Sequence, residues 1–394
     1  MSLGEALSGA VARRETELVA LRRDLHRHPE LAFGERRTAE IVAERLHRAG
    51  LEVTTDIGGT GVVGVLRGDL PGRSIGWRAD MDALPLVESL DVPFVSATPG
   101  VMHACGHDGH TAIAIVMAEM LASRRASLQG TAVFLFQPAE EVFGGARRMI
   151  EDGALDRQPL DEIYGLHLFG RLPVGLVELV DGISMASADF IDIEIRGRGG
   201  HGAVPHLAVD PIAVAAHILV GLQQVVRSAV PAGDAAVLSI GQIEAGSAPN
   251  IIPETALLRG SLRALRERDR RALLDRLPSF CAATASAFGA AASVRQSGGC
   301  CPALVNRAEQ TARATRSIEA ELGAEMVVAG APAMASDDMS LFLRARPGCY
   351  FRVGISPTHS RSVPHHAPEF EMNEDGLPVG LRVALNVLRS RLGA

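Results

Sequence analysis

Strongly apolar runs alternate with amphipathic stretches through the first part of the chain, and this alternation restricts the possible folds more than any other feature. Strand-like runs cover residues 61–66, 74–80, 130–136 and 162–169, and a helical pattern at 111–122 separates two of them. Strands that are apolar on both faces and alternate with helices are typical of a parallel sheet buried between helices. We therefore predict an α/β fold in which a parallel-rich sheet is flanked by helices.

The pattern changes near Met185. The segment FIDIEIRG alternates apolar and polar residues, as a half-exposed antiparallel strand does. The order of strands and helices that follows, β-α-β-β-α-β, is typical of a small α+β sandwich. Since 394 residues exceed what one hydrophobic core usually organises, we predict a larger domain of residues 1–184 and 299–394 with an inserted α+β sandwich of residues 185–298.

Composition excludes several classes of protein. The net charge of −7 and the lack of a basic tract argue against a nucleic-acid partner. All 39 basic residues are Arg, which excludes Schiff-base catalysis, pyridoxal phosphate attachment and a P-loop lysine. The start of the chain is unlike a signal peptide and no eighteen apolar residues run without interruption, so we expect a cytoplasmic protein that does not span a membrane. Five irregularly spaced cysteines fit a reducing compartment better than a disulfide framework.

Residues suited to chemistry gather at the ends of the predicted strands. Asp80 and Asp82, the pair Glu140 and Glu141, and His167 each lie at or just past the end of an apolar run. Open α/β sheets build their sites at the carboxyl ends of their strands. These side chains are therefore predicted to face one common site.

The stretch MHACGHDGHT contains two side chains with metal-ligand chemistry. Cys105 and His107 are two residues apart, so both can face one point, and thiolate and imidazole are good ligands for borderline divalent metals. His103, Asp108 and His110 could orient them. An isolated C-x-H motif is more often a buried cysteine beside a helix cap, here at Asp108, so this stretch alone does not establish a metal site.

The stretch FQPAEE makes a metal site more plausible. A carboxylate pair at the end of an apolar strand is costly unless a cation lies near. One carboxylate could bind metal while the other takes a proton from a metal-bound water. His167 in an apolar strand and His366 in a loop would each, taken singly, more often be structural. Together, one thiolate, three imidazoles and two carboxylates are what a two-metal hydrolase needs.

Seven stretches resemble, in order, the successive motifs of the aminoacylase-type metallopeptidases: WRADMDALP, HACGHDGHT, FQPAEE, GLHLF, GRGGHGAVPH, PNIIPETALLRGSLR and HHAPEF. The nearest branch contains hippurate hydrolase, indoleacetyl-amino-acid hydrolase and N-acetyldiaminopimelate deacetylase. The resemblance implies that two divalent metal ions (Zn, Mn, Co or Ni) hydrolyse the amide bond of small N-acyl amino acids, with Glu140 as general base. His366 is preferred to His365, because the family's ligand directly precedes a small residue and a proline. The implied metal ligands are Cys105, His107, Glu141, His167 and His366.

The resemblance also implies roles outside the ligand set. Asp82 matches an acid that supports a metal-binding histidine in more distant relatives. His201 is expected to reach the metal site of a partner subunit and to polarise the scissile carbonyl. Asn250 and Arg263 match positions that grip the substrate carboxylate, a task suited to a guanidinium fork. The larger domain would then be catalytic, and the inserted one would serve as lid and as dimerisation domain of a homodimer.

Other functions stay open at this point. A nucleophilic hydrolase could use Cys105 with His107. A dipeptidase or carboxypeptidase could share the same architecture, and a non-catalytic protein could hold metal without reacting. The segments 297–305 and 335–343 depart from the family's pattern near the expected substrate pocket, so the sequence leaves the acyl group and the amino acid undetermined.

Overall fold

The computed structural model describes residues 9–156, 158–356 and 364–393, and the chain forms two compact units. Unit 1 contains Met1–Gly182, Val305–Ala331 and Asp337–Ala394, and unit 2 contains Ile183–Leu304 and Pro332–Ser336. Residues 183–184, residues 299–304 and the short segment Pro332–Ser336 were expected in the larger domain, but they belong with unit 2. The functions expected of unit 2, as lid and dimerisation domain, stay predictions.

The sheet of unit 1 is mixed, with a parallel centre. Strand β3 pairs in parallel with both β4 and β5, and β5 pairs in parallel with β16, whereas β1 and β2 are antiparallel additions at one edge. This agrees with the expected parallel-rich α/β sheet, so the predicted fold class is confirmed. In sheet order the strands are β1 (Glu52–Ile57), β2 (Gly61–Arg67), β4 (Gln129–Gln137), β3 (Leu70–Asp80), β5 (Glu162–Pro173), β16 (Gly348–Ser356), β6 (Val177–Leu179) and β15 (Val327–Ala329).

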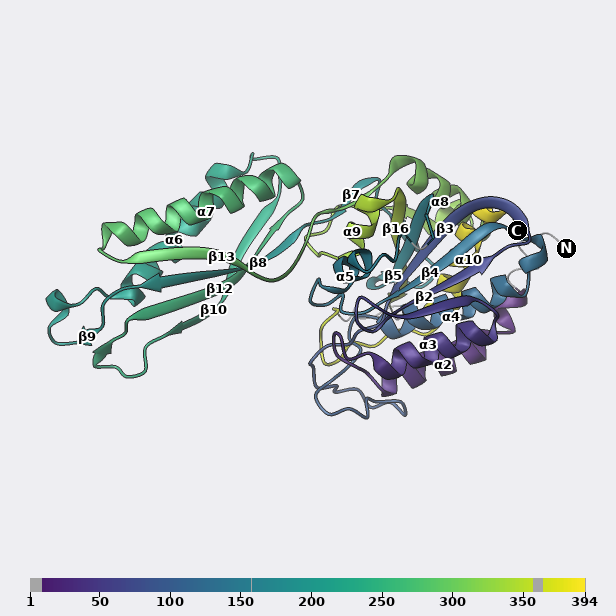
Figure 1. The fold of residues 1–394 in the computed structure, drawn as a ribbon, viewed down its shortest axis with the longest axis horizontal. Helices are drawn as coiled ribbons and strands as arrows, with labels where there is room; N and C mark the ends of the chain where they lie inside the picture. The colour runs from purple at the N-terminus through teal and green to yellow at the C-terminus, as the bar shows by residue number, and fades with distance from the viewer. Residues whose placement is uncertain (1–8, 157, 357–363, 394) are drawn as a thin grey trace. The chain divides into compact units, whose positions relative to one another are not determined.

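Helix α4 (His107–Ala122) is the central helix of unit 1. It contacts β3, β4 and β5 and is covered in turn by α2 (Glu15–Arg27), α3 (Arg36–Arg48) and α10 (Gly376–Leu392) (Figure 1). Because neighbours surround it, most of its residues are buried, and its sequence is apolar on nearly all sides. The first turn of α4 is therefore fixed in place by the core. The remaining helices are α5 (Gly145–Glu151), α8 (Ala308–Leu322) and α9 (Met339–Ala345).

Unit 2 is an antiparallel sheet with two helices on one face. Alternate residues of the strands, such as Ile191, Ile193 and Leu258, face α6 (Pro211–Ala229) and α7 (Glu267–Ala287) and form a core of their own. In order the strands are β10 (Ala236–Ala245), β12 (Thr255–Ala264), β8 (Ala188–Arg196) and β13 (Ala291–Cys301). Two further pairs of short strands are β9 (Gly200–His201) with β11 (Ile251–Ile252), and β7 (Gly182–Met185) with β14 (Leu304–Asn306).

Among the described residues, α6 is the one helix whose length and composition would allow it to cross a membrane. The core helix of a globular unit can meet the same criteria. Val214, Ile218 and Leu222 pack into the core of unit 2, so the apolar character of α6 has a structural explanation.

Candidate metal centre

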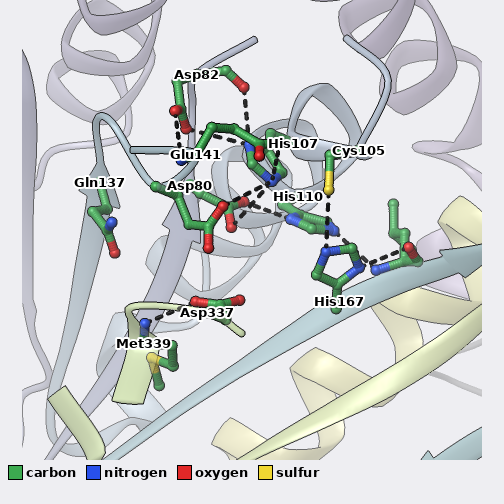
Figure 2. A network of polar contacts seen from close by, with 12 residues as sticks. Asp80, Asp82, Cys105, His107, His110, Gln137, Glu141, His167, Asp337 and Met339 are labelled. Carbon is green, nitrogen blue, oxygen red and sulfur yellow. Dashed lines mark hydrogen bonds and ion pairs between the residues drawn. The ribbon is translucent and has the colours of Figure 1, made fainter. Parts of the chain in front are cut away.

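The five predicted ligands converge at one place in unit 1. The ligand atoms of Cys105, His107 and His167 lie within 4.8 Å of one another, and so do those of Cys105, Glu141 and His366. The Cys105 thiol belongs to both groups, as a ligand shared by two ions would. Figure 2 shows several of these side chains pointing toward one another from the loop before α4, from the segment after β4 and from β5.

The turn before α4 brings Cys105 and His107 to this point. Gly106 lies between them with φ of 99°, a left-handed conformation that glycine adopts at no steric cost. His107 then starts the helix, and its Nδ1–H donates to the carbonyl oxygen of Asp82 at 2.9 Å. That bond leaves Nε2 of His107 directed at the other ligands.

His167 is held in the same manner. Its Nδ1–H donates to the carbonyl oxygen of Leu168 at 2.8 Å, and its Nε2 lies 3.6 Å from Sγ of Cys105. The sequence placed His167 at or just past a strand end, whereas β5 continues to Pro173. The residue is nevertheless accessible to the site, because pairing of β3 with β5 stops at Gly165.

The two adjacent histidines near the carboxyl terminus have different environments. His366 has φ of 63°, donates its backbone N–H to Ala104, and has Nε2 3.3 Å from the carboxylate of Glu141. His365 instead accepts a hydrogen bond at Nε2 from the backbone of Gly170. The geometry therefore supports the choice of His366 as the ligand.

Buried polar atoms without partners mark the place where a cation fits. Nε2 of His107 and Oε1 of Glu141 have no hydrogen-bond partner among the described residues. A buried polar atom left unsatisfied is costly, and a divalent cation would satisfy both atoms at once. The donor set of thiolate, imidazole and carboxylate suits zinc and similar borderline metals.

The charges around Glu140 also favour a cation. Burial, followed by the carboxylates of Asp337 and Glu141, raises the pKa of Glu140 well above its usual value. Its side chain is buried; it lies outside the two groups that contain Cys105, and it forms a further group with His107 and Glu141. Carboxylates that repel one another in a buried site are stabilised by a bound dication.

Asp82 joins the two stretches that carry the ligands. Its Oδ2 accepts the backbone N–H of Glu141 at 2.9 Å, and its Oδ1 lies 3.3 Å from Nδ1 of His107. One carboxylate thus orients ligands from two different loops, in keeping with the supporting role expected of Asp82.

Asp80 is held from both sides. It accepts from Nδ1 of His110 at 2.5 Å and from the guanidinium of Arg78 at 2.5 Å. Nε2 of His110 accepts the backbone N–H of Leu168, so both ring nitrogens of His110 are already used. His110 is therefore a support for Asp80 and not a further ligand.

A buried polar cluster centred on Arg78 was not predicted from the sequence. The guanidinium is 1% exposed and also donates to Gln137 at 2.7 Å, to Asp337 at 3.1 Å and to Asp338 at 3.2 Å. The signal was present in WRADMDALP, FQPAEE and ASDDMSLFL, since a charged residue inside an apolar strand requires a partner. The partners could not be read from the sequence because they come from three separate segments.

The predicted residues of unit 2 fall into two groups. His201 in β9 pairs with Ile251 of β11, and the backbone of Asn250 accepts the N–H of Gly202, so His201 and Asn250 are neighbours. Arg263 lies toward the opposite end of β12 and donates to Ser336 at 2.9 Å. The eight residues from the start of β12 to Arg263 span about 26 Å at a strand rise of about 3.3 Å per residue. The structure therefore does not bring Arg263 together with His201 within one unit 2.

Three comparisons with known proteins bear on this site. The model of Peptidase family M20/M25/M40 matches residues 76–390. The chain is 44% identical over 274 residues to hippurate hydrolase of Campylobacter jejuni, covering 69% of this chain and 70% of the relative. It is 35% identical over 384 residues to thermostable carboxypeptidase 2 of Saccharolobus solfataricus, covering 96% of each. A crystal structure of the Bacillus subtilis YXEP protein, described as a dinuclear metal binding peptidase from the M20 family, matches with a TM-score of 0.81 and 34% identity, covering 96% of this chain and 98% of that one.

Proposed function

The chain belongs to Peptidase family M20/M25/M40, and from that membership we infer that it is a metal-dependent amidohydrolase that cleaves the amide bond of N-acyl amino acids. The observation that carries this inference is the ligand cluster itself. Cys105, His107, Glu141, His167 and His366 supply two overlapping groups of donors, and the buried Glu140 lies beside His107 and Glu141, where it would serve in proton transfer.

In the proposed mechanism two divalent ions, when bound, supply an activated water and polarise the amide carbonyl. Glu140 takes the proton of the attacking water and gives it to the leaving amine. The thiolate of Cys105 and the carboxylate of Glu141 would hold the ions, and Asp82 keeps Glu141 and His107 oriented. The acyl group leaves as a carboxylic acid and the amino acid leaves with a free amine.

A nucleophilic mechanism at Cys105 is disfavoured by the surroundings of the thiol. Burial, followed by the nearby carboxylate of Glu141, raises the pKa of Cys105. A cysteine nucleophile needs a lowered pKa and a base that is itself held in place. In metal-free protein Cys105 therefore lacks the activation that such a mechanism requires.

Cleavage of peptides is the second candidate function, because a relative of similar length is named a carboxypeptidase. An N-acyl amino acid and a peptide present the same amide and the same terminal carboxylate. The two substrates differ on the acyl side of the amide bond, where a peptide carries a free amine and an N-acyl amino acid does not. Rates on matched N-acyl amino acids and dipeptides would separate the two candidates.

We further propose that two copies of the chain complete each site. A small N-acyl amino acid cannot bridge the roughly 26 Å of strand that separates the two ends of β12. His201 and Asn250 at one end, and Arg263 at the other, would thus serve different sites. A homodimer that uses the exposed edge strand β10 would allow this and would also cover its unpaired backbone groups.

A cytoplasmic location is part of the proposal. All five cysteines lie in the described part of the chain, and no disulfide joins any of them there. A reducing compartment keeps the thiol of Cys105 available to bind metal.

The test of the function compares two neighbouring carboxylates. Purified protein should hydrolyse N-acetyl, N-benzoyl or longer N-acyl amino acids, lose this activity on chelation, and regain it with Zn²⁺, Mn²⁺, Co²⁺ or Ni²⁺. Glu140→Gln should lower kcat by about 10²–10⁴-fold and keep its metal, whereas Glu141→Gln should lose metal. Full activity in protein shown to be metal-free would refute the proposal, and swapped behaviour of the two variants would reverse their roles.

The test of the shared site mixes two inactive variants, His201→Ala and Glu140→Gln, under conditions where subunits exchange. If His201 acts in the partner's site, one site of each heterodimer carries both lesions and the other carries none. Activity should then return to up to half the wild-type rate per heterodimer. Heterodimers that are verified and still inactive would mean either that His201 serves its own subunit or that the two sites depend on each other.

A further inference from the structure

The loop that carries Glu140 and Glu141 has an unusual backbone. Ala139, directly before the pair, has φ of 52°, and Phe143, two residues after it, has φ of 50°. Residues with a Cβ rarely adopt this left-handed conformation, and they keep it only where the surroundings enforce it. The two catalytic carboxylates are therefore presented by a strained loop.

Three buried acids hold the backbone of this loop and of the helix turn that follows it. Asp82 accepts the N–H of Glu141, as described above, and Asp338 accepts, at 3.1 Å, the N–H of Ala146 in the first turn of α5. The strained start of the loop is held by Glu35, whose Oε1 accepts the N–H of Ala139 at 2.8 Å. Among these three acids Glu35 alone bonds to a residue with positive φ.

The carboxylate of Glu35 holds a second strained residue as well. The same Oε1 accepts the N–H of Phe33 at 3.0 Å, and Phe33 has φ of 62°. The Phe33 ring lies so close to Gly144 that a Cβ there would come within 3.1 Å of the ring. The hydroxyl of Thr60 donates to the other oxygen of Glu35. Glu35 thus fixes the loop directly at Ala139 and, through Phe33, at Gly144.

The burial of Glu35 shows that it is more than a helix cap. It directly precedes α3, yet its side chain does not cap that helix, and the residue is 0% exposed. A carboxylate removed from water is costly unless its hydrogen bonds are satisfied. Here the satisfied bonds go to the strained backbone of Phe33 and Ala139, which would relax without them.

We propose that Glu35 is a positioning residue for amide hydrolysis: it holds Ala139 in the left-handed conformation that directs Glu140 to the water and Glu141 to the metal. This inference rests on the proposed function, because it takes the roles of the two glutamates from there. Glu35 acts through the backbone of the loop and touches neither metal nor substrate.

The experiment measures coupling between Glu35 and Ala139. Glu35→Leu removes the acceptor, and kcat is expected to fall on the order of 10–100-fold, the usual effect of losing a group that orients a ligand. Glycine adopts positive φ without strain, so adding Ala139→Gly to Glu35→Leu should restore at least about fivefold of that loss. The same glycine should give no comparable gain in the wild-type background. Glu35→Gln keeps one carbonyl oxygen for both backbone N–H groups and should retain most of the activity.

A matched control separates positioning from general stability. Glu30 is also a carboxylate that accepts two backbone N–H groups, from Arg37 at 3.0 Å and Thr38 at 2.9 Å, but these belong to the start of α3. Glu30→Leu should lower the melting temperature without a matching loss of kcat, and Ala139→Gly should not correct it. The proposal would be overturned if Glu35→Leu folds and its kcat stays within about threefold of wild type. It would also be overturned if the effects of Glu35→Leu and Ala139→Gly on kcat simply multiply in the double variant.

Co²⁺ affinity gives a readout that does not depend on substrate. Glu141 lies in the same loop, so Glu35→Leu should weaken Co²⁺ binding and Ala139→Gly should recover part of it. If the unmodified chain hydrolyses no N-acyl amino acid, the proposed function fails while this coupling is still measured. If hydrolysis is found but neither kcat nor Co²⁺ affinity shows coupling, only the role of Glu35 fails.

Discussion

Replacement of Arg78 by methionine tests how much of the stability of unit 1 depends on one buried charge. The guanidinium is 1% exposed and is the shared cation of Asp80, Asp337 and Asp338, at 2.5, 3.1 and 3.2 Å. Removing one partner of a buried ion pair typically costs about 3–5 kcal/mol, because the other partner stays buried without a counter-charge. Methionine fills much of the same space, so the lost charge dominates. We expect the free energy of unfolding of unit 1 to fall by about 3–5 kcal/mol at pH 8.

The assay is urea denaturation of chelated protein followed by tryptophan fluorescence. Trp77 is the only tryptophan in the chain and is buried next to Arg78 in β3, so its emission reports the unfolding of unit 1 itself. Arg48→Met is the matched control, because Arg48 is 69% exposed and pairs with Glu44 on the surface. Such a pair contributes at most about 1 kcal/mol. A loss below about 1 kcal/mol for Arg78→Met would refute the reasoning.

The pH dependence shows whether charge or packing causes the loss. Burial alone would raise the pKa of Asp80, but the charges of Arg78, His107 and His110 hold it well below its usual value. When the pKa of a carboxylate is lower in the folded than in the unfolded state, its ionisation stabilises the folded state. This stabilisation is complete above the pKa of the unfolded state, about 3.9, and is lost as the pH falls through the pKa of the folded state. Burial already raises the pKa of Asp338 to about 7. Without Arg78 the acids protonate at higher pH, so the difference between wild type and variant should shrink from pH 8 to pH 5. A constant difference would indicate packing.

Two further predictions concern other parts of unit 1. Burial opposes ionisation of Glu162, but bonds from Arg391, 2.9 Å to each oxygen, and from Tyr164 lower its pKa below the usual value. Arg391→Met should therefore lower the free energy of unfolding by its full amount at pH 7 and by progressively less below about pH 4. Urea denaturation at the two pH values measures this difference, and equal losses of free energy at both would contradict the prediction. His366→Ala should lose metal by elemental analysis while His365→Ala keeps most of it, and the reverse result would exchange their assignments.

The strands of the fold could be predicted wherever the local pattern was strong. The apolar runs at 61–66, 74–80 and 130–136 correspond to β2, β3 and β4, because a strand that is buried on both faces has a continuous apolar sequence. The order of the strands could not be predicted in the same way. Strand β16 lies beside β5 although some 180 residues separate them in the chain, and no local pattern contains that pairing.

The proposed metal ligands came from the family resemblance, because Cys105 and His107 taken alone more often indicate a buried cysteine beside a helix cap. The side chains that support them could not be named from the sequence. Glu35 directly precedes α3, and nothing in the sequence around it indicates a role in the site. Its importance comes from the N–H of Ala139, more than a hundred residues away, and a backbone donor has no sequence signature.

The supporting acids also explain why a metal suits this site. Glu140, Asp337 and Asp338 have carboxylate oxygens within 4.8 Å of one another, and in this group all three are buried. Arg78 is the buried cation that pairs with both aspartates, and it is shared with Asp80 as well. Arg78 and the neighbouring His107 and His110 offset the charge of Asp80, whereas burial and the carboxylates of Asp337 and Glu141 raise the pKa of Glu140. Divalent ions bound by the neighbouring ligands would supply further positive charge beside these acids. Glu140, Asp337 and Asp338 would then also strengthen the binding of those ions.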